Sequence, residues 1–179
     1  MKASAIQVPT TIGVFSASSP ISATVPVRYE RGQHFLEEKG YTIQNGLLYG
    51  KQDGYRSGSI QERAREFNEL LYQEDVPILM ASIGGMNTNS ILPYLDYEYL
   101  KQHPKIIVGY SDTTALLLAI YAKTGLVTFY GPALAASFGE FPPFVDWTFA
   151  RFEEMITGNI AIPHRLEQPA VWTDEFIPW

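Results

Sequence analysis

The segment Ile106-Ile107-Val108-Gly109-Tyr110-Ser111-Asp112-Thr113-Thr114 is the part of the sequence most informative about its architecture. It begins inside an apolar run from Lys105 to Gly109, which is typical of a strand buried on both faces. The residues from Asp112 to Thr124 are apolar nearly all round and end at Gly125, which indicates a buried helix. A strand therefore runs directly into a helix, and a serine stands at the corner.

Similar strand and helix patterns alternate along the rest of the chain. The clearest helix begins with the capping box Ser59-Ile60-Gln61-Glu62 and should stop before Pro77. Alternation of this kind predicts an α/β fold, a mostly parallel sheet with helices on both faces. The other expected strands are Ile12–Phe15, Tyr41–Gln44, Ile78–Ile83 and Val127–Tyr130, and the other expected helices are Val27–Lys39 and one capped by Asp146 and ended at Gly158.

Composition narrows the class of protein. The 179 residues are enough for one domain, and 46% apolar against 18% charged residues favours a packed core over disorder. A net charge of −6 argues against nucleic acid as the main partner, and the absence of cysteine excludes disulfides and thiolate chemistry. The apolar run Ala115–Ala122 is too short to span a bilayer, and Met1–Gln7 lacks a signal-peptide core. We therefore expect a cytoplasmic protein.

Three strand ends carry small polar residues and should meet at one edge of the sheet: Ser16–Pro20, Gly84–Asn89 and Gly109–Thr114. A serine between a strand and a helix resembles a nucleophile elbow, although Thr113 stands where G-x-S-x-G has its final glycine. The alternative is that Ser111 and Asp112 only cap the helix. The Gly84-Gly85 pair either lets a backbone approach a ligand or makes a tight turn.

A serine nucleophile needs a base, and the chain offers three histidines. His34 lies in the middle of a predicted helix. His103 precedes the strand that leads to Ser111, so about five residues of strand separate the two by roughly 15–20 Å. His164 lies in a proline-rich tail that the sequence does not place. No pair of residues shows the spacing of metal ligands, so no metal site is predicted.

The tail from residue 161 to 179 has no helical stripe and contains Trp172, Phe176 and Trp179. These aromatic side chains either stack on a ring of a ligand or pack against the domain or a partner.

Taken together, four motifs resemble the N-terminal half of the serine LD-carboxypeptidase family. They are Ile12–Phe15 with Ser16-Ala17-Ser18-Ser19-Pro20, Arg28-Tyr29-Glu30-Arg31-Gly32, Ser82-Ile83-Gly84-Gly85-Met86-Asn87-Thr88-Asn89 and Gly109-Tyr110-Ser111-Asp112-Thr113-Thr114. The branches of this family include murein-recycling LD-carboxypeptidases and microcin C immunity proteins. The Gly-Gly-x-Asn-Thr-Asn form and the tail from Trp172 to Trp179 resemble the immunity branch more closely.

The resemblance implies roles for particular residues. Ser111 would be the acylating nucleophile, and the backbone N–H groups of Gly85 and Asp112 would form the oxyanion hole. The bond cleaved would be an amide in an LD-peptide of murein, or the bond joining a peptidyl or aminoacyl group to an adenylate, without metal or cofactor. The resemblance further implies substrate binding by Met86, Asn87, Trp172 and Trp179.

The family completes its triad with a Glu and a His from a C-terminal domain, and no residue of this chain matches them. We therefore expect an N-terminal nucleophile domain over residues 1–160, followed by a linker or aromatic loop over 161–179 that leads to an absent C-terminal domain. Such a chain should be nearly inactive alone. Two other hypotheses are a non-catalytic module that binds a small molecule, and a domain that forms a homodimer through the tyrosine-rich segment Tyr94–Tyr99.

Overall fold

The computed structural model describes residues 1–158 and 163–175 and contains a five-stranded sheet. All recorded strand pairs are parallel, and the spatial order is β2-β1-β3-β4-β5. The order reverses beside β1, so the carboxyl ends of β1 and β3 diverge into loops that leave a crevice at that edge. The strands are β1 (Thr10–Phe15), β2 (Tyr41–Asn45), β3 (Ile78–Ala81), β4 (Ile106–Gly109) and β5 (Phe129–Tyr130).

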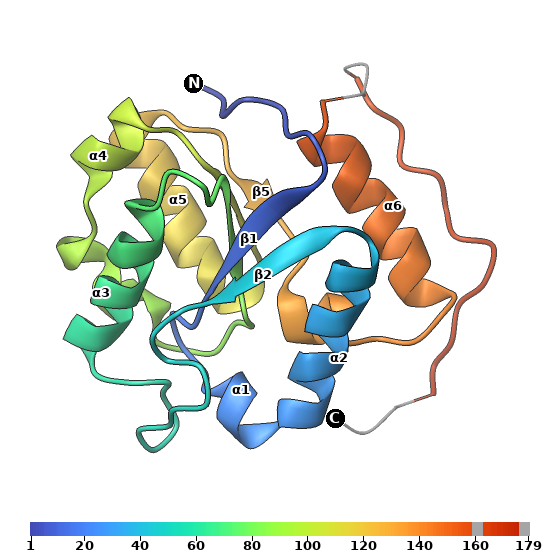
Figure 1. Ribbon diagram of the computed structural model, residues 1–179, viewed down its shortest axis with the longest axis horizontal. Helices are drawn as coiled ribbons and strands as arrows, with labels where there is room; N and C mark the ends of the chain where they lie inside the picture. Colours follow the sequence, from blue (N-terminus) through green and yellow to red (C-terminus); the bar gives the residue numbers. More distant parts are fainter. Residues whose placement is uncertain (159–162, 176–179) are drawn as a thin grey trace.

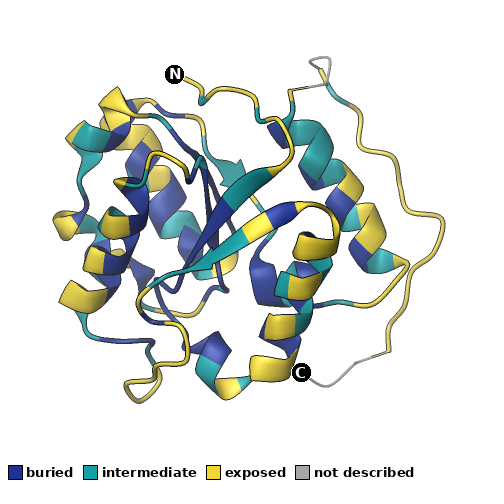
Figure 2. Ribbon diagram, viewed as in Figure 1, coloured by how far each residue is buried: buried dark blue, intermediate teal, exposed yellow. Residues whose placement is uncertain are grey.

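Helices cover both faces of the sheet, as predicted (Figure 1). One apolar core lies between the sheet and α2, η3 and α6, and the other lies between the sheet and α3 and α5. Figure 2 shows helices whose outer faces are exposed, and the central strands β3 and β4 between them are buried throughout. The helical segments are α1 (Ile21–Thr24), α2 (Pro26–Glu38), α3 (Ile60–Leu71), η1 (Thr88–Tyr94), α4 (Tyr97–Gln102), η2 (Ser111–Thr113), α5 (Thr114–Thr124), η3 (Leu134–Phe138) and α6 (Phe144–Ile156).

Most predicted elements are confirmed to within two residues, and the exceptions lie at helix starts. The last helix begins at Phe144 rather than after Asp146, so the predicted cap is wrong. Pro143 takes the capping position, and Asp146 lies in the first turn, where a carboxylate still favours the helix dipole. The helix expected from Asp112 instead starts with a 3₁₀ turn, and regular α-helix follows from Thr114.

The capping box at Ser59 is confirmed, because the Ser59 side chain accepts from the Glu62 N–H and Glu62 caps back. One face of α3 then carries Glu66 into the interior. Its two carboxylate oxygens accept hydrogen bonds from the N–H groups of Ser16 (2.6 Å) and Leu48 (2.8 Å). Glu66 thus ties the loops that follow β1 and β2 to α3.

We expect stability to depend on the protonation of Glu66. Burial raises the pKa of this carboxyl from 4.5 to about 7, although the two N–H groups act in the opposite direction. Between these two pH values the folded state binds more protons than the unfolded chain. This group's contribution to the free energy of unfolding therefore falls as pH rises from about 4.5 to about 7, by about 3 kcal/mol at most.

Urea unfolding between pH 4.5 and 8 measures this contribution. Glu66→Gln should lose the slope, and it should be less stable because an amide nitrogen cannot accept from one of the two N–H groups. Glu37→Gln is the control, since Glu37 is an exposed glutamate on α2. If the free energy of unfolding of Glu66→Gln fell with pH as steeply as that of the wild type, the proposed titration of Glu66 would be refuted.

Within residues 1–158 and 163–175, no helix is long and apolar enough to cross a membrane. The expected cytoplasmic location stays a prediction.

Candidate active site

The strand-to-helix corner after β4 holds Ser111 in a rare backbone conformation. Tyr110 is extended, and Ser111 has a φ of 59°, the one positive φ at a non-glycine position in the described part of the chain. A side chain in this left-handed region costs about 1–2 kcal/mol. Such strain persists only where the surrounding structure imposes it, and it is the geometry of a nucleophile elbow.

The capping alternative does not describe this corner. Ser111 is exposed to solvent, and neither η2 nor α5 has a side-chain cap in the described structure. The carboxylate of Asp112 leaves its own helix and accepts hydrogen bonds from the turn after β3. The helix start is therefore left open beside the Ser111 hydroxyl.

Gly84 lies against this hydroxyl from the end of β3. A Cβ atom added at Gly84 would stand 3.0 Å from Ser111 Oγ, 2.9 Å from Ser111 Cβ and 3.2 Å from the Asp112 nitrogen. Any larger residue would push against the serine. The approach of the backbone thus requires glycine at this position.

Gly85 follows with a φ of +153°, and an added Cβ there would overlap the hydroxyl of Ser18. Among the described residues, no hydrogen-bond partner is recorded for the N–H of Gly85 or of Asp112. These are the two groups that the family resemblance implies as oxyanion donors. A pocket of ≈ 260 Å³ opens here, lined by Ser19, Ile83, Gly84, Gly85, Tyr110, Ser111 and Ala136.

The Asp112 side chain fastens the corner to the turn after β3. Its Oδ2 accepts from the N–H of Asn87 (2.8 Å), the N–H of Thr88 (2.9 Å) and the Thr88 hydroxyl (2.8 Å). Burial acts to raise the pKa of this carboxyl, but the hydrogen bonds from Thr88, Ser18 and Asn87 outweigh it and lower the pKa. Asp112 is therefore an ionised anchor rather than a base.

Ser18, which follows β1, completes the turn. Its hydroxyl accepts from the N–H groups of Met86 (3.0 Å) and Asn87 (3.1 Å). The polar segment Ser16–Pro20 marked this strand end in the sequence, but nothing there singled out Ser18. The three strand ends that were expected to share one edge of the sheet, Ser16–Pro20, Gly84–Asn89 and Gly109–Thr114, therefore do meet.

The residues predicted to bind substrate are not gathered in one place that the structure describes. The side chains of Met86 and Trp172 are 78% and 81% exposed, and the Asn87 side chain is turned toward Arg63. Trp179 lies outside the described residues, and so does the boundary predicted between residues 160 and 161. The described tail, 163–175, runs past α6 without regular structure (Figure 1).

The three histidines all have neighbours away from Ser111. His34 pairs with Glu38 on α2 (3.1 Å), and the ring of His103 stacks on Tyr99 with centroids 4.1 Å apart. His164 lies 3.8 Å from Glu154 of α6. Within the described ranges, none of them is recorded in contact with the serine, and no group of three or more metal-ligating side chains occurs.

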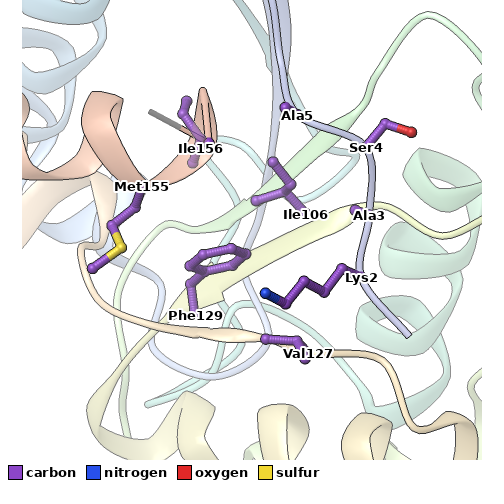
Figure 3. Close-up of a pocket in the computed structure, with 10 residues that line it drawn as sticks. Lys2, Ala3, Ser4, Ala5, Ile106, Val127, Phe129, Met155 and Ile156 are labelled. Atoms are coloured by element: carbon purple, nitrogen blue, oxygen red, sulfur yellow. The ribbon is translucent and has the colours of Figure 1, made fainter. Parts of the chain in front are cut away.

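Another hollow, of ≈ 350 Å³, lies at the opposite edge of the sheet (Figure 3). The N-terminal segment from Lys2 to Ala5 closes it against Ile106, Val127 and Phe129, which lie at the amino ends of β4 and β5. Its lining is mostly apolar and includes no candidate nucleophile or base paired for catalysis. The residues singled out from the sequence as a candidate site lie at the other edge, around Ser111.

A parallel sheet that presents a strained serine at a strand-to-helix corner is the architecture of serine hydrolases that transfer acyl groups. The chain belongs to the LD-carboxypeptidase family, because the model of the family's N-terminal domain matches residues 12–131. The Escherichia coli protein described as microcin C7 self-immunity protein MccF is 54% identical over 169 residues, covering 94% of this chain and 49% of that protein.

Solved structures agree with this assignment. A structure of MccF in complex with aspartyl sulfamoyl adenosine matches with a TM-score of 0.87 and 55% identity, over 88% of this chain and 47% of that one. A muramoyltetrapeptide carboxypeptidase from Oxalobacter formigenes matches with a TM-score of 0.73 and 27% identity, over 83% and 48%. The chain thus spans about half the length of the relatives it matches.

Proposed function

We propose that this chain is the N-terminal, nucleophile-bearing half of a serine carboxypeptidase-like hydrolase. Its substrate would be a peptidyl or aminoacyl nucleotide, as for microcin C immunity proteins, or an LD-peptide of murein. The observation that carries the proposal is Ser111, exposed and held at a φ of 59° beside the free N–H groups of Gly85 and Asp112.

In this reaction the Ser111 Oγ attacks the carbonyl carbon of the scissile bond, and its proton passes to a base. The carbonyl oxygen becomes an anion, which the N–H groups of Gly85 and Asp112 stabilise. The leaving group then departs, as an amine that takes up the proton when the bond is an amide, or as a phosphate when the substrate is an aminoacyl adenylate. Water hydrolyses the acyl-serine to release the acid. One such donor contributes about 100- to 1000-fold to the rate, so two fixed donors are a large part of the catalytic apparatus.

The base and its orienting carboxylate would come from a separate C-terminal half, as the family resemblance implies. The half-length coverage of the relatives supports this proposal. Residues 1–160 would then be the nucleophile domain, and 161–179 the segment leading to the second domain. The chain alone should be nearly inactive, since loss of a triad member lowers the rate by several orders of magnitude.

The immunity-type substrate is the better supported of the two. The relative with the higher identity carries the name of an immunity protein, and its structure holds an aspartyl sulfamoyl adenosine. Trp172 or Trp179 would stack on the base of such a nucleotide, and Met86 would border the acyl group. The Asn87 side chain, which was expected to do the same, is turned toward Arg63 and would act only through its backbone.

Co-expression with the C-terminal half of the Escherichia coli relative tests the proposal. The reconstituted pair should hydrolyse an aminoacyl adenylate at least 1000-fold faster than the chain alone, and Ser111→Ala should remove that activity. Thr114→Ala is not a suitable control, because its hydroxyl bonds the Ser111 carbonyl, whereas Thr42→Ala on β2 is remote and exposed. Hydrolysis that survives Ser111→Ala would rule the assignment out.

The second candidate, a non-catalytic binding module, rests on the exposed Trp172 and on the glycine turn. Calorimetry of the chain with aspartyl sulfamoyl adenosine separates the two. Micromolar binding with no turnover by the reconstituted pair would favour the module, and the absence of binding would rule the module out.

The homodimer hypothesis, with contacts through Tyr94–Tyr99, predicts a dimer in sedimentation experiments. A monomer in solution would count against it.

A further inference from the structure

Arg63 of α3 is a cation buried behind the proposed oxyanion turn, and it is only 1% exposed. Its Nε donates to the carbonyl of Gly58 (3.0 Å), and its Nη1 donates to the carbonyl of Ala17 (2.6 Å). These carbonyls belong to the loop before α3 and the loop after β1. The guanidinium therefore fixes two loops at the carboxyl edge of the sheet.

The same guanidinium holds the turn after β3 through Asn87. Nη1 donates to the side-chain Oδ1 of Asn87 (2.6 Å) and to its carbonyl oxygen (3.2 Å). Nη2 donates to the Ser90 hydroxyl (3.0 Å), which in turn donates to the Asn87 carbonyl (2.7 Å). Asn87 is thus held at its side chain and at its backbone.

The opposite side of this turn faces the corner at Ser111. The N–H groups of Asn87 and Thr88 donate to the Asp112 carboxylate, which belongs to the residue directly after the serine. Gly85 lies two residues before Asn87 in the same turn. Hydrogen bonds therefore run from Arg63 through Asn87 to the Asp112 carboxylate. Gly85 is joined to them only by the two residues of backbone that separate it from Asn87.

An arginine suits this place for a geometric reason. Its planar fork donates from three nitrogens in fixed directions, and here all three are used on separate loops. A lysine ammonium would keep the charge but could not reach the three sets of acceptors from one rigid plane. Loss of the fork should therefore loosen the turn even where the charge remains.

We propose that Arg63 is a positioning residue, which sets the direction of the Gly85 N–H by clamping Asn87 between the loop after β1 and the corner at Ser111. The inference rests on the proposed function, because it assigns Arg63 to the oxyanion site of that same reaction. Arg63 itself touches no reacting atom. Its effect is on the rate of acyl transfer and not on substrate affinity.

The test uses the reconstituted pair and four variants of this chain. Arg63→Lys and Arg63→Ala should lower kcat about 10-fold or more while KM stays within about twofold. Methylguanidinium should restore much of the rate to Arg63→Ala, and methylammonium, a point charge, should not. The matched control is Arg65→Met, since Arg65 is an exposed arginine on the same helix and should leave kcat unchanged.

Ser90→Ala is the milder variant for the case in which loss of Arg63 prevents folding. It removes the hydroxyl that joins Arg63 Nη2 to the Asn87 carbonyl. It should lower kcat as well, by a smaller factor than the Arg63 variants do. Equal kcat values for wild type, Arg63→Lys and Ser90→Ala would overturn the inference and leave the proposed function standing.

A second readout needs no activity. The amide resonance of Gly85 in the ¹⁵N–¹H spectrum of the chain alone should shift in Arg63→Lys and stay in place in Arg65→Met. If the wild-type pair proves inactive, the proposed function fails while this shift still decides whether Arg63 sets the Gly85 amide. An unshifted Gly85 resonance in Arg63→Lys would contradict the positioning role.

Discussion

Ser111→Gly should abolish acyl transfer by the reconstituted pair and, compared with Ser111→Ala, make the chain more stable. Both variants lack the hydroxyl, so both should lose at least 1000-fold in rate. They differ at the backbone, because Ser111 has a φ of 59° and alanine keeps the Cβ that this conformation disfavours. Glycine adopts this conformation freely. We therefore expect the free energy of unfolding of Ser111→Gly to exceed that of Ser111→Ala by about 1 kcal/mol.

Urea unfolding of the two variants measures this difference. The matched control is the same pair of substitutions at Thr113, which has a φ of −60° in the same turn, so that Thr113→Gly should be less stable than Thr113→Ala. A Ser111→Gly variant that is less stable than Ser111→Ala would show that the corner stores no strain. The elbow would then be an ordinary helix start.

Gly84→Ala should lower kcat of the reconstituted pair by about 100-fold while the chain stays folded. The added Cβ would stand 3.0 Å from Ser111 Oγ and 2.9 Å from Ser111 Cβ, so the serine or the strand end must move. A displacement of about 1 Å at the reacting atom costs about 100-fold in rate. Steady-state kinetics of the variant check this, with circular dichroism to confirm the fold.

Gly50→Ala serves as the control for replacing a glycine in a loop at this edge. Gly50 has a positive φ of 71°, but nothing lies within 4 Å of an added Cβ. Its alanine variant should lose some stability and keep its kcat. If Gly84→Ala retained full kcat, Gly84 would be free to accept a side chain and the close contact with Ser111 would have no catalytic meaning.

The sequence was sufficient for the parts of the molecule that depend on neighbouring residues. The buried run before Gly109, the apolar stretch after Thr113 and the capping box at Ser59 each predicted an element that the structure contains. Local patterns also compete, however. Asp146 is a good capping residue, but the helix begins earlier, with Pro143 at the capping position and Asp146 within the first turn.

The supporting contacts of the site could not be predicted, because they join residues far apart in the chain. Arg63 reads as one more polar position on an amphipathic helix, and its burial becomes apparent only when the loops after β1 and β3 close around it. Ser18 and Glu66 likewise gain their partners from other loops. Spacing along one chain carries no signal for such three-loop contacts.

The site at which a fluorophosphonate reacts with the protein shows whether Ser111 is the nucleophile. In this reaction the serine oxygen forms a bond to phosphorus and fluoride leaves, so peptide mapping by mass spectrometry identifies the nucleophile. We expect one phosphonyl adduct on the reconstituted pair, located at Ser111, and no adduct when the pair carries Ser111→Ala. Hydrolytic activity together with an adduct on another residue, and none at Ser111, would contradict it.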